Sequence, residues 1–448
     1  MGLMSDGEGM RTWRAASTAS RDSTAQKEAG DEEQNSSEVK QHEDDTVSCI
    51  TDAQLSPDGT CIFTTDLARK FSVYPFTSNI AAEQEQQKLV PYAQFPSSDP
   101  IWAFTVNPHF DVNDHNTSTV LVSRRDQYIG LHNALWNLSE TQETGEQSFR
   151  TGPVDISTKI ASYKLVDKLT EAVKAPLSLA WSPCGAYFYA GQKNEIAVFD
   201  LTYTEDPVSK IRTIPSTRNK LKGGGWGFKG DVSALAPSTA NADILAAGTR
   251  TRYVGLYDVQ SNQEITHLAL PGKVNGRRVM NDQLRIVIGE GVTQLKWSPD
   301  GTYLYVAERD SDAILIYDVR KFGLALAHCA GRKALTRQKM GFDVWAQRDD
   351  YNTGASHEIW AGGTDGRVRV WRNPCLREGA VEADEVIDVG VDPVSNALVH
   401  PYGHAAVVSR GRYEVGGRQE GKGITRGGTT HPTYNEWGYL DILGLGIY

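Results

Sequence analysis

The sequence predicts an all-β fold that repeats one small unit, and a recurring phrase is the first observation behind this prediction. The phrase is Trp-Ser-Pro-Cys-Gly at 181–185 and Trp-Ser-Pro-Asp-Gly at 297–301, and a weaker copy, Leu-Ser-Pro-Asp-Gly, occupies 55–59. Alternating apolar runs flank each copy, and a further run then closes on an aromatic residue, as at Phe199-Asp200 and Tyr317-Asp318. This order is the one expected within one blade of a β-propeller: a strand, a Pro/Asp-Gly turn, a second strand, a polar turn and a third strand.

The first three blades are expected at 49–76, 101–131 and 177–201. The first holds the weaker phrase followed by Cys-Ile-Phe, and the third holds a full copy followed by Tyr-Phe-Tyr. The second replaces the phrase with Asn-Pro-His at 107–109 but keeps apolar runs on both sides of it. Short alternating runs of β-branched and aromatic residues are typical of half-buried strands, so each segment is expected to form a blade.

Four further blades follow at 231–259, 292–320, 342–371 and 386–408. The fifth blade is the clearest copy, and the fourth, sixth and seventh keep the alternating runs without the phrase. Seven units at spacings near the ~40–45 residues of a blade predict a seven-bladed WD40 β-propeller. Its repeated tryptophans are expected to pack blade against blade in the core. These are Trp181, Trp297, Trp360 and Trp371.

Closure of the ring is predicted from the C-terminal end. The run 437–443 has strand character and lies beyond a Gly-rich stretch, so we expect it to be the outer strand of blade seven, reached through an insertion at 411–436. In the alternative, the segment 37–46 supplies that strand from the other end. The predicted organisation is therefore a tail at 1–46, a propeller at 47–410, the insertion or loop at 411–436 and a closing strand at 437–448.

Composition separates the tail from the propeller. Residues 1–46 hold 11 acidic and 5 basic residues and hardly any aliphatic ones, so they contribute −6 to the formal net charge of −10 and are expected to be disordered. The five cysteines form no Cys-x-x-Cys pair, which favours reduced thiols in a cytosolic or nuclear protein and argues against a zinc site. No stretch has the length of a signal or membrane segment, so we expect a soluble protein with no membrane partner.

No catalytic motif is convincing. Residues 225–230 match the Gly-x-Gly-x-x-Gly pattern, but a strand-like run follows where phosphate binding requires a helix. His400 and His404 stand close in the sequence, yet no third metal ligand accompanies them. No Walker lysine or nucleophile elbow is present. We therefore predict a protein that is not an enzyme, with no catalytic residues, metal, cofactor or small-molecule substrate.

Basic residues concentrate in three consecutive connectors between blades three and six. Connectors between successive blades emerge on one face of a ring, so these residues should form a positive sector, although they could also serve only to keep loops soluble. Trp226 and Phe228 could present aromatic faces for bases to stack on. If ~6 of the cations meet phosphates, log K should fall against log salt with a slope of roughly −4 to −5. The predicted RNA-binding residues are Lys210, Arg212, Arg218, Lys220, Lys222, Trp226, Lys229, Arg277, Arg278, Arg332, Lys333, Arg337, Gln338 and Lys339.

Four stretches of the chain resemble the telomerase Cajal-body protein family, a WD-repeat group with fungal splicing-associated nuclear members. They are the opening blade at 56–64, Ser-Arg-Arg-Asp-Gln-Tyr-Ile-Gly-Leu at 123–131, blade five with Tyr-Asp-Val-Arg at 317–320, and Gly-Arg-Lys-Ala-Leu-Thr-Arg-Gln-Lys-Met-Gly-Phe-Asp at 331–343. The last is the most specific, because propeller packing does not dictate a connector. The resemblance implies a protein that binds small nuclear RNA with its ribonucleoprotein proteins and assists their assembly or localisation to Cajal bodies. It implies a nuclear location, with the cytoplasm as the alternative.

Other classes of function stay open at the level of sequence. Residues 317–320 also fit the ending that substrate receptors of cullin-type ubiquitin ligases use to dock an adaptor, with Arg320 as the docking residue. A G-protein β-type signalling scaffold would need an N-terminal coiled coil, and 1–46 shows no apolar heptads. A generic protein–protein scaffold needs no RNA at all.

Overall fold

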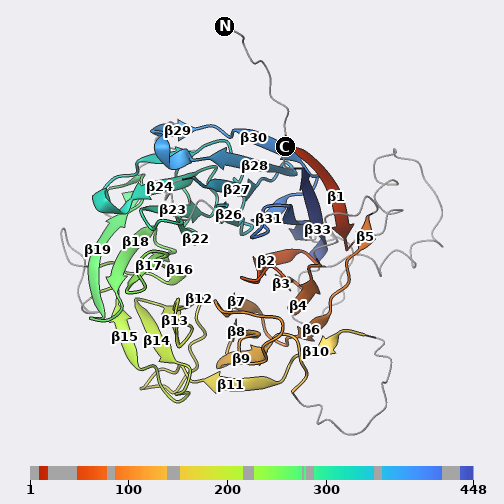
Figure 1. Ribbon diagram of the computed structural model, residues 1–448. Helices are drawn as coiled ribbons and strands as arrows, with labels where there is room; N and C mark the ends of the chain where they lie inside the picture. The colour runs from red at the N-terminus through yellow and green to blue at the C-terminus, as the bar shows by residue number, and fades with distance from the viewer. Residues whose placement is uncertain are drawn as a thin grey trace, which may run out of the picture.

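The protein is a ring of seven antiparallel sheets around a central channel (Figure 1). The computed structural model describes residues 10–18, 48–77, 86–138, 152–214, 227–274, 277–278, 287–347, 356–415 and 434–446. Within these ranges regular structure is almost entirely β, with short 3-10 turns at Val319–Lys321 and Pro374–Leu376. The predicted fold class, a seven-bladed WD40 β-propeller, is confirmed.

Blades one to four each contain four strands, which follow one another from the channel outwards. Blade one comprises β2 (Ile50–Leu55), β3 (Cys61–Asp66), β4 (Lys70–Pro75) and β6 (Ala93–Pro96). Blade two comprises β7 (Ile101–Val106), β8 (Thr119–Arg124), β9 (Ile129–Asn133) and β11 (Lys159–Tyr163). Blade three comprises β12 (Ser178–Trp181), β13 (Tyr187–Gln192), β14 (Glu195–Asp200) and β15 (Ser209–Arg212). Blade four comprises β16 (Val232–Pro237), β17 (Ile244–Thr249), β18 (Tyr253–Asp258) and β19 (Gln263–Ala269).

Blades five to seven complete the ring. Blade five comprises β22 (Val292–Trp297), β23 (Tyr303–Glu308), β24 (Ile314–Asp318) and β25 (Ala327–Cys329). Blade six comprises β26 (Phe342–Trp345), β27 (Glu358–Gly362), β28 (Arg367–Arg372) and β30 (Glu385–Asp388). Blade seven comprises β31 (Val394–Val399), β32 (Ala405–Val415), β33 (Tyr434–Gly446) and β1 (Arg11–Ser17). Short parallel strands extend three outer edges: β10 (Val154–Asp155), β29 (Gly379–Val381) and β5 (Gln87–Lys88).

The recurring phrase has a structural explanation. Its tryptophan lies at the end of an innermost strand and donates an indole N–H to the preceding blade: Trp181 Nε1 to the Thr105 carbonyl at 3.1 Å, and Trp297 Nε1 to the Ala236 carbonyl at 2.9 Å. Its glycine adopts a left-handed conformation, as Gly301 does with φ of 68°. The four repeated tryptophans are at most 5% exposed, as expected for core residues. The phrase therefore fixes both a turn and a contact between blades.

The boundary between blades six and seven differs from the prediction. Residues 386–388 were expected to begin blade seven, but they belong to β30, which pairs with β28 as the outermost strand of blade six. The first strand of blade seven is β31, which is buried along its whole length, whereas β30 is mostly exposed or half-buried. A short apolar run does not show by itself whether it lies next to the channel or at the rim.

Closure of the ring also differs from the prediction. The C-terminal strand β33 is the third strand of blade seven, and the fourth is β1, from the N-terminal segment expected to be disordered. Asp441 is fully buried, accepts a hydrogen bond from the Ser17 hydroxyl at 2.6 Å, and forms an ion pair with Arg410 at 2.5 Å. The prediction of disorder is thus wrong for 11–17, and the alternative strand at 37–46 lies outside the described residues.

Candidate nucleic-acid interface

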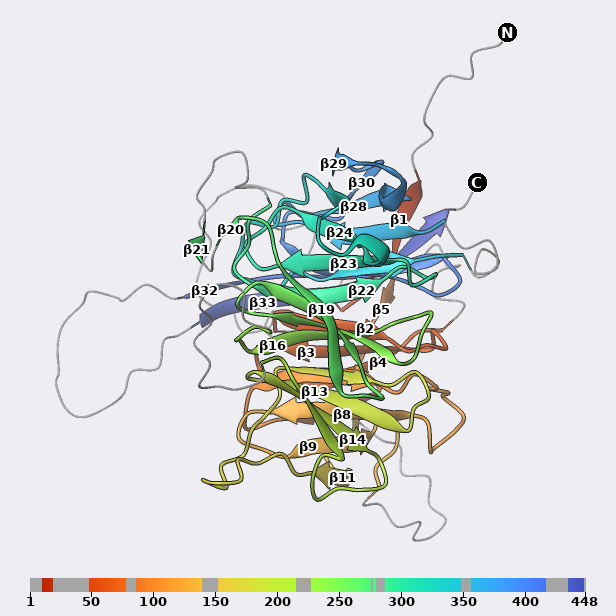
Figure 2. The same ribbon diagram turned by 90° about the vertical axis from the view of Figure 1, so that its left-hand side faces the viewer.

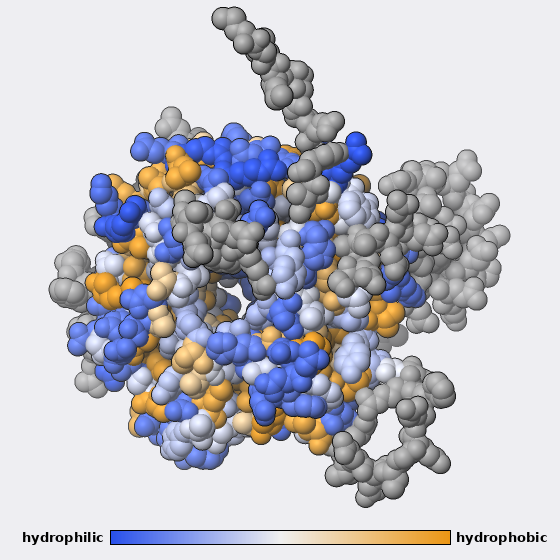
Figure 3. All heavy atoms as spheres, in the orientation of Figure 1, coloured by the Kyte–Doolittle hydropathy of each residue, from blue (hydrophilic) through white to orange (hydrophobic). Residues whose placement is uncertain are grey.

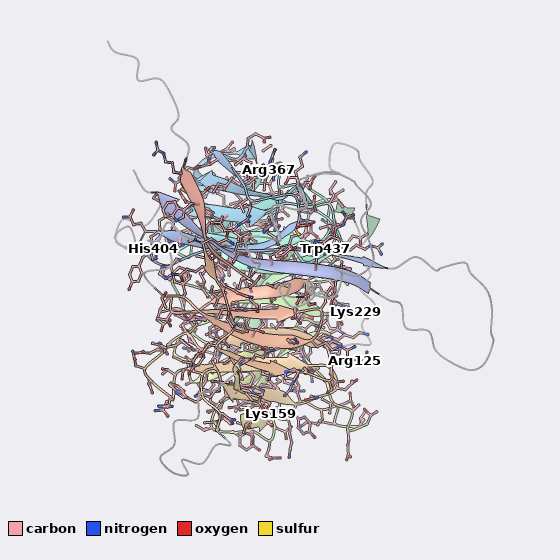
Figure 4. The ribbon with its side chains drawn as sticks, turned by 90° about the vertical axis from the view of Figure 1, so that its right-hand side faces the viewer. Arg125, Lys159, Lys229, Arg367, His404 and Trp437 are labelled. Atoms are coloured by element: carbon pink, nitrogen blue, oxygen red, sulfur yellow. The ribbon has the colours of Figure 1, made fainter. Side chains whose placement is uncertain are left out.

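The connectors between blades lie on one side of the disc, which we call the connector face. The short ladder of β20 (Lys273–Val274) and β21 (Arg277–Arg278) and the far end of the β32–β33 hairpin project from this side (Figure 2). Figure 4 shows Lys229, Arg125 and Trp437 on it and His404 on the other side. The central channel also opens on the opposite face, where hydrophilic side chains border the hollow (Figure 3). The topology therefore places the connectors on one face of the ring, as predicted.

The first basic connector is only partly available to a ligand. Lys210 and Arg212 lie on β15, where Lys210 Nζ pairs with Glu195 Oε1 at 3.2 Å and Arg212 is exposed. Phe228 is fully buried and its ring stacks on that of Tyr253 at 5.4 Å, so the expectation that it faces bases is wrong. Lys229 is half-buried at the rim of a hollow. Four predicted residues lie outside the described residues: Arg218, Lys220, Lys222 and Trp226.

The second basic connector contributes the β20–β21 ladder. Arg277 pairs with Val274 and Arg278 with Lys273 across its two strands. This places the backbone of both predicted arginines on the connector face beyond blade four (Figure 2). Their predicted role in RNA binding stays a prediction.

The third connector is divided between the core and the surface. Arg332 is fully buried, donates from Nη2 to the Gly341 carbonyl at 2.7 Å, and has its pKa lowered to about 10 because burial disfavours the charged form. Its expected place on the RNA-binding surface is therefore wrong. Lys339 Nζ pairs with Asp52 Oδ2 at 2.7 Å. Lys333 and Arg337 are exposed, and neither is within ion-pair distance of a carboxylate in the described ranges.

Gln338 connects this connector to the long hairpin of blade seven. Its side-chain amide donates to the Gly411 carbonyl at 3.5 Å and to Cys49 Sγ at 3.7 Å. Together with Arg337 and Lys339, Gln338 lines a pocket of about 550 Å³ on the connector face. The predicted residues 337–339 are therefore brought together at one hollow.

Trp102 borders the same pocket, and sequence analysis did not select it as a site residue. It lies on β7, and the residue is 41% exposed, whereas the repeated tryptophans are buried. Pairing of β7 with β8 shifts register between Ile101 and Ala103, so Trp102 is the extra residue of a β-bulge. Bulges redirect side chains, and here the indole lines hollows at the mouth of the channel.

Two arginines that the sequence analysis also missed share the channel mouth with Trp102. Arg250 follows β17 and Arg309 follows β23, and both line a hollow of about 420 Å³ with Trp102 and Lys339. Arg309 Nη1 donates to the Arg337 carbonyl at 2.6 Å. The pKa of Arg309 is lowered, first by burial and then by the charge of Arg250. Across the described ranges no carboxylate pairs with Arg250 or Arg309 within 4.0 Å.

Acidic groups limit the positive charge of this region. Asp66 lines the pocket of about 550 Å³, and burial raises its pKa to about 6, against backbone hydrogen bonding and the charge of Lys70. Glu436 lies in the same pocket, and Glu290 lies beside the arginines. The mouth therefore offers a flat aromatic ring and guanidinium groups among scattered carboxylates, which suits a ligand with both an aromatic ring and an anionic group.

The alternative docking residue Arg320, and His400, which was not predicted to bind a metal, lie away from this mouth. Arg320 follows β24 on the face opposite the connectors, its side chain is 67% exposed, and Nη2 pairs with Asp318 Oδ2 at 2.7 Å. His400 stacks on Phe76 and its Nε2 lies 3.0 Å from the Gly59 carbonyl. Among the residues that the structure describes, no group of three His, Cys, Asp or Glu side chains is arranged to hold a metal ion. No helix in those ranges is long and apolar enough to cross a bilayer.

Comparison with known proteins supports the fold and the resemblance. A model of the family "WD domain, G-beta repeat" matches residues 282–318, which contain most of blade five. Guanine nucleotide-binding protein negative regulator 1 of Schizosaccharomyces pombe is 29% identical over 288 residues, which are 64% of this chain and 60% of that protein. Telomerase Cajal body protein 1 of Homo sapiens is 26% identical over 319 residues, 70% of this chain and 48% of its own length.

A further relative extends this similarity. The Telomerase Cajal body protein 1 homolog of Drosophila melanogaster is 25% identical over 327 residues, covering 70% of this chain and 49% of its own length. The chain thus spans between about half and three fifths of the length of these curated relatives. The resemblance to the telomerase Cajal-body protein family is confirmed, and the WD40 propeller indicates a scaffold with a non-catalytic fold.

Proposed function

We propose that this propeller is a nuclear scaffold that binds small nuclear RNA through its connector face and assists ribonucleoprotein assembly or localisation to Cajal bodies. One observation carries the proposal: an arc of cations without carboxylate partners in the described ranges follows the connector face from blade three to the edge of blade six. Cations free of carboxylates remain available to phosphates. The arc comprises Arg212, Arg250, Arg309, Lys333 and Arg337.

The similarity to Telomerase Cajal body protein 1 supports the nuclear part of the proposal, because that relative is named for the body in which we place this chain. The RNA partner and the accompanying ribonucleoprotein proteins are part of the proposal. Compared with the residues predicted from the sequence, the proposed RNA-binding surface excludes Arg332 and includes Arg250 and Arg309.

Crosslinking in cells followed by RNA sequencing tests the proposal. The wild-type chain should recover small nuclear RNA, and Arg250→Glu with Arg309→Glu should lose most of it. The matched control, Arg320→Glu with Lys321→Glu, changes the same net charge on the opposite face and should leave recovery unchanged. Equal recovery from both double variants would overturn the assignment of the connector face, and no RNA from the wild type would overturn the function.

A second candidate function rests on the name of one relative. The Schizosaccharomyces pombe protein is called a negative regulator of a guanine nucleotide-binding protein, and it is 29% identical to this chain. On this alternative the propeller binds a G-protein subunit. Pull-down from nuclear and cytoplasmic extracts separates the two candidates, because a G-protein subunit recovered without RNA would favour the second. A ubiquitin-ligase adaptor that is lost on Arg320→Ala would instead support the docking role of Arg320.

A further inference from the structure

The bulge that holds Trp102 recurs in other blades, where it holds small hydroxyl residues. The innermost strands of blades one, four, five and seven shift register at the corresponding place. Ser233 Oγ donates to the Val292 carbonyl of the next blade at 2.6 Å, and Ser395 Oγ donates to the Ile50 carbonyl at 3.1 Å. The architecture therefore needs only a short hydrogen-bonding side chain here. The residues at the corresponding bulges are Thr51, Ser233, Thr293 and Ser395.

Trp102 makes no comparable side-chain hydrogen bond within the described part of the chain. Trp181 and Trp297 bury their rings and bond their indole N–H groups to a neighbouring blade, but Trp102 keeps 41% of its surface exposed. In the described part of the chain no aromatic ring or cation stacks on it, and its indole N–H makes no hydrogen bond. An exposed indole in a hollow is a common means of binding a flat ligand.

The charges around Trp102 indicate where the anionic part of a ligand would lie. On the side of blades one and seven the pocket contains Asp66 and Glu436, whose charges oppose a phosphate, together with the cation Arg69. On the side of blades four and five the described lining of the hollow contains Arg250, Arg309 and Lys339, which is paired with Asp52, against one acid, Glu290. A phosphate would therefore lie towards the two arginines.

Resting on the proposed function, we infer that Trp102 stacks on a single unstacked nucleobase and that Arg250 and Arg309 bind the adjacent phosphate. The pocket volume of about 550 Å³ is in the range of sites for small ligands and would accommodate one nucleotide. A base held within a duplex cannot expose its face to the ring, so the site selects single-stranded segments. An acidic peptide would satisfy the arginines but leave the indole uncovered.

The test replaces Trp102 with the residue that blades one and five carry at this bulge. Trp102→Thr should weaken binding of a fluorescein-labelled single-stranded oligoadenylate about tenfold to a hundredfold, because one stacked base is lost. Trp102→Phe keeps an aromatic face and should restore most of the affinity. The same oligoadenylate annealed to oligouridylate should bind equally to all three proteins. Thermal unfolding checks that both variants fold.

Adenosine monophosphate is the second probe, and it separates a base within a strand from a free nucleotide. If Trp102→Thr binds the single strand as tightly as the wild type, the stacking role is overturned and the proposed function stands. If the wild type binds the mononucleotide through Trp102 but not the strand, the pocket stands and the RNA function is overturned. If the wild type binds neither the single strand nor the mononucleotide, the stacking role of Trp102 and the proposed RNA function are both overturned.

Discussion

At the scale of single residues, buried ion pairs join neighbouring blades. Arg252 and Glu308 form a bidentate pair between blades four and five, with Nε–Oε1 at 2.6 Å and Nη2–Oε2 at 2.8 Å. Both side chains are almost fully buried, at 8% and 1% exposure. Removal of one partner from such a pair leaves an uncompensated charge inside the protein.

Glu308→Ala should therefore lower the free energy of unfolding by about 3–5 kcal/mol, measured by urea denaturation. Asp388→Ala breaks the exposed pair with Arg367 and serves as the control, with an expected loss below about 1 kcal/mol. The double variant Arg252→Met with Glu308→Leu should recover stability, because no charge is then left unpaired. Similar losses from Glu308→Ala and Asp388→Ala would contradict the proposed burial penalty.

Asp66 should make stability depend on pH. Its pKa of about 6 in the folded protein exceeds the ordinary value of 3.8, so the folded state binds the proton more tightly than the unfolded state does. The resulting stabilisation is full below about pH 4 and is lost as pH rises through about 6. Asp66→Asn should remove about 1–3 kcal/mol of this dependence and stabilise the protein at pH 7. Denaturation of the wild type and of Asp66→Asn from pH 4 to 8 measures this pH dependence of stability. Parallel profiles for the two proteins would contradict the prediction.

At the scale of elements, β1 protects an edge that would otherwise be open. It pairs along β33 and buries Ala15 and Ala16 completely. Without it, β33 would expose unpaired backbone groups, and such edges promote association. Arg14 and Ser17 would also no longer contact Asp441.

Deletion of residues 1–18 should lower the free energy of unfolding by at least about 3 kcal/mol, because a buried carboxylate loses two partners. Urea denaturation measures the loss, and light scattering should detect association through the open edge. Deletion of residues 1–9 keeps the whole strand and is the control. Equal stability of the two truncated chains would show that β1 is dispensable.

Sequence patterns predicted the repeated elements because each blade carries its own turn and its own alternation. They failed at β1, whose Ala-Ala pair lacks the β-branched residues typical of strands. They also placed Arg332 and Phe228 at the surface, because burial of a connector residue depends on neighbours far away in the chain. Trp102 could have been found by aligning the innermost strands, since it stands where other blades hold Ser or Thr.

At the scale of the whole molecule, the arrangement of charge matters more than its sum. The chain is acidic overall, with a formal net charge of −10, yet the connector face carries an arc of cations from blade three to the edge of blade six. A local arc of this kind can bind a polyanion despite an unfavourable net charge, because salt screens distant acids more strongly than close contacts.

Affinity for single-stranded RNA should therefore fall steeply with salt. If the five cations of the arc each meet a phosphate, log K should fall against log salt with a slope of about −3 to −4, and Arg250→Glu with Arg309→Glu should reduce the slope by about 1–2. Fluorescence anisotropy at several potassium chloride concentrations gives the slope. A slope near zero for the wild type would exclude phosphate contacts as the basis of binding.

The pairing of β1 with β33 also orders events during translation. Ser17 leaves the ribosome long before its hydrogen-bond partner Asp441, which follows 424 residues later. Blades one to six can form as they emerge, but the ring of blades cannot close until β33 has been synthesised. A nascent chain interrupted before β33 keeps two unpaired strand edges, to which chaperones and proteases can bind. Closure of the ring therefore requires β33 as well as β1.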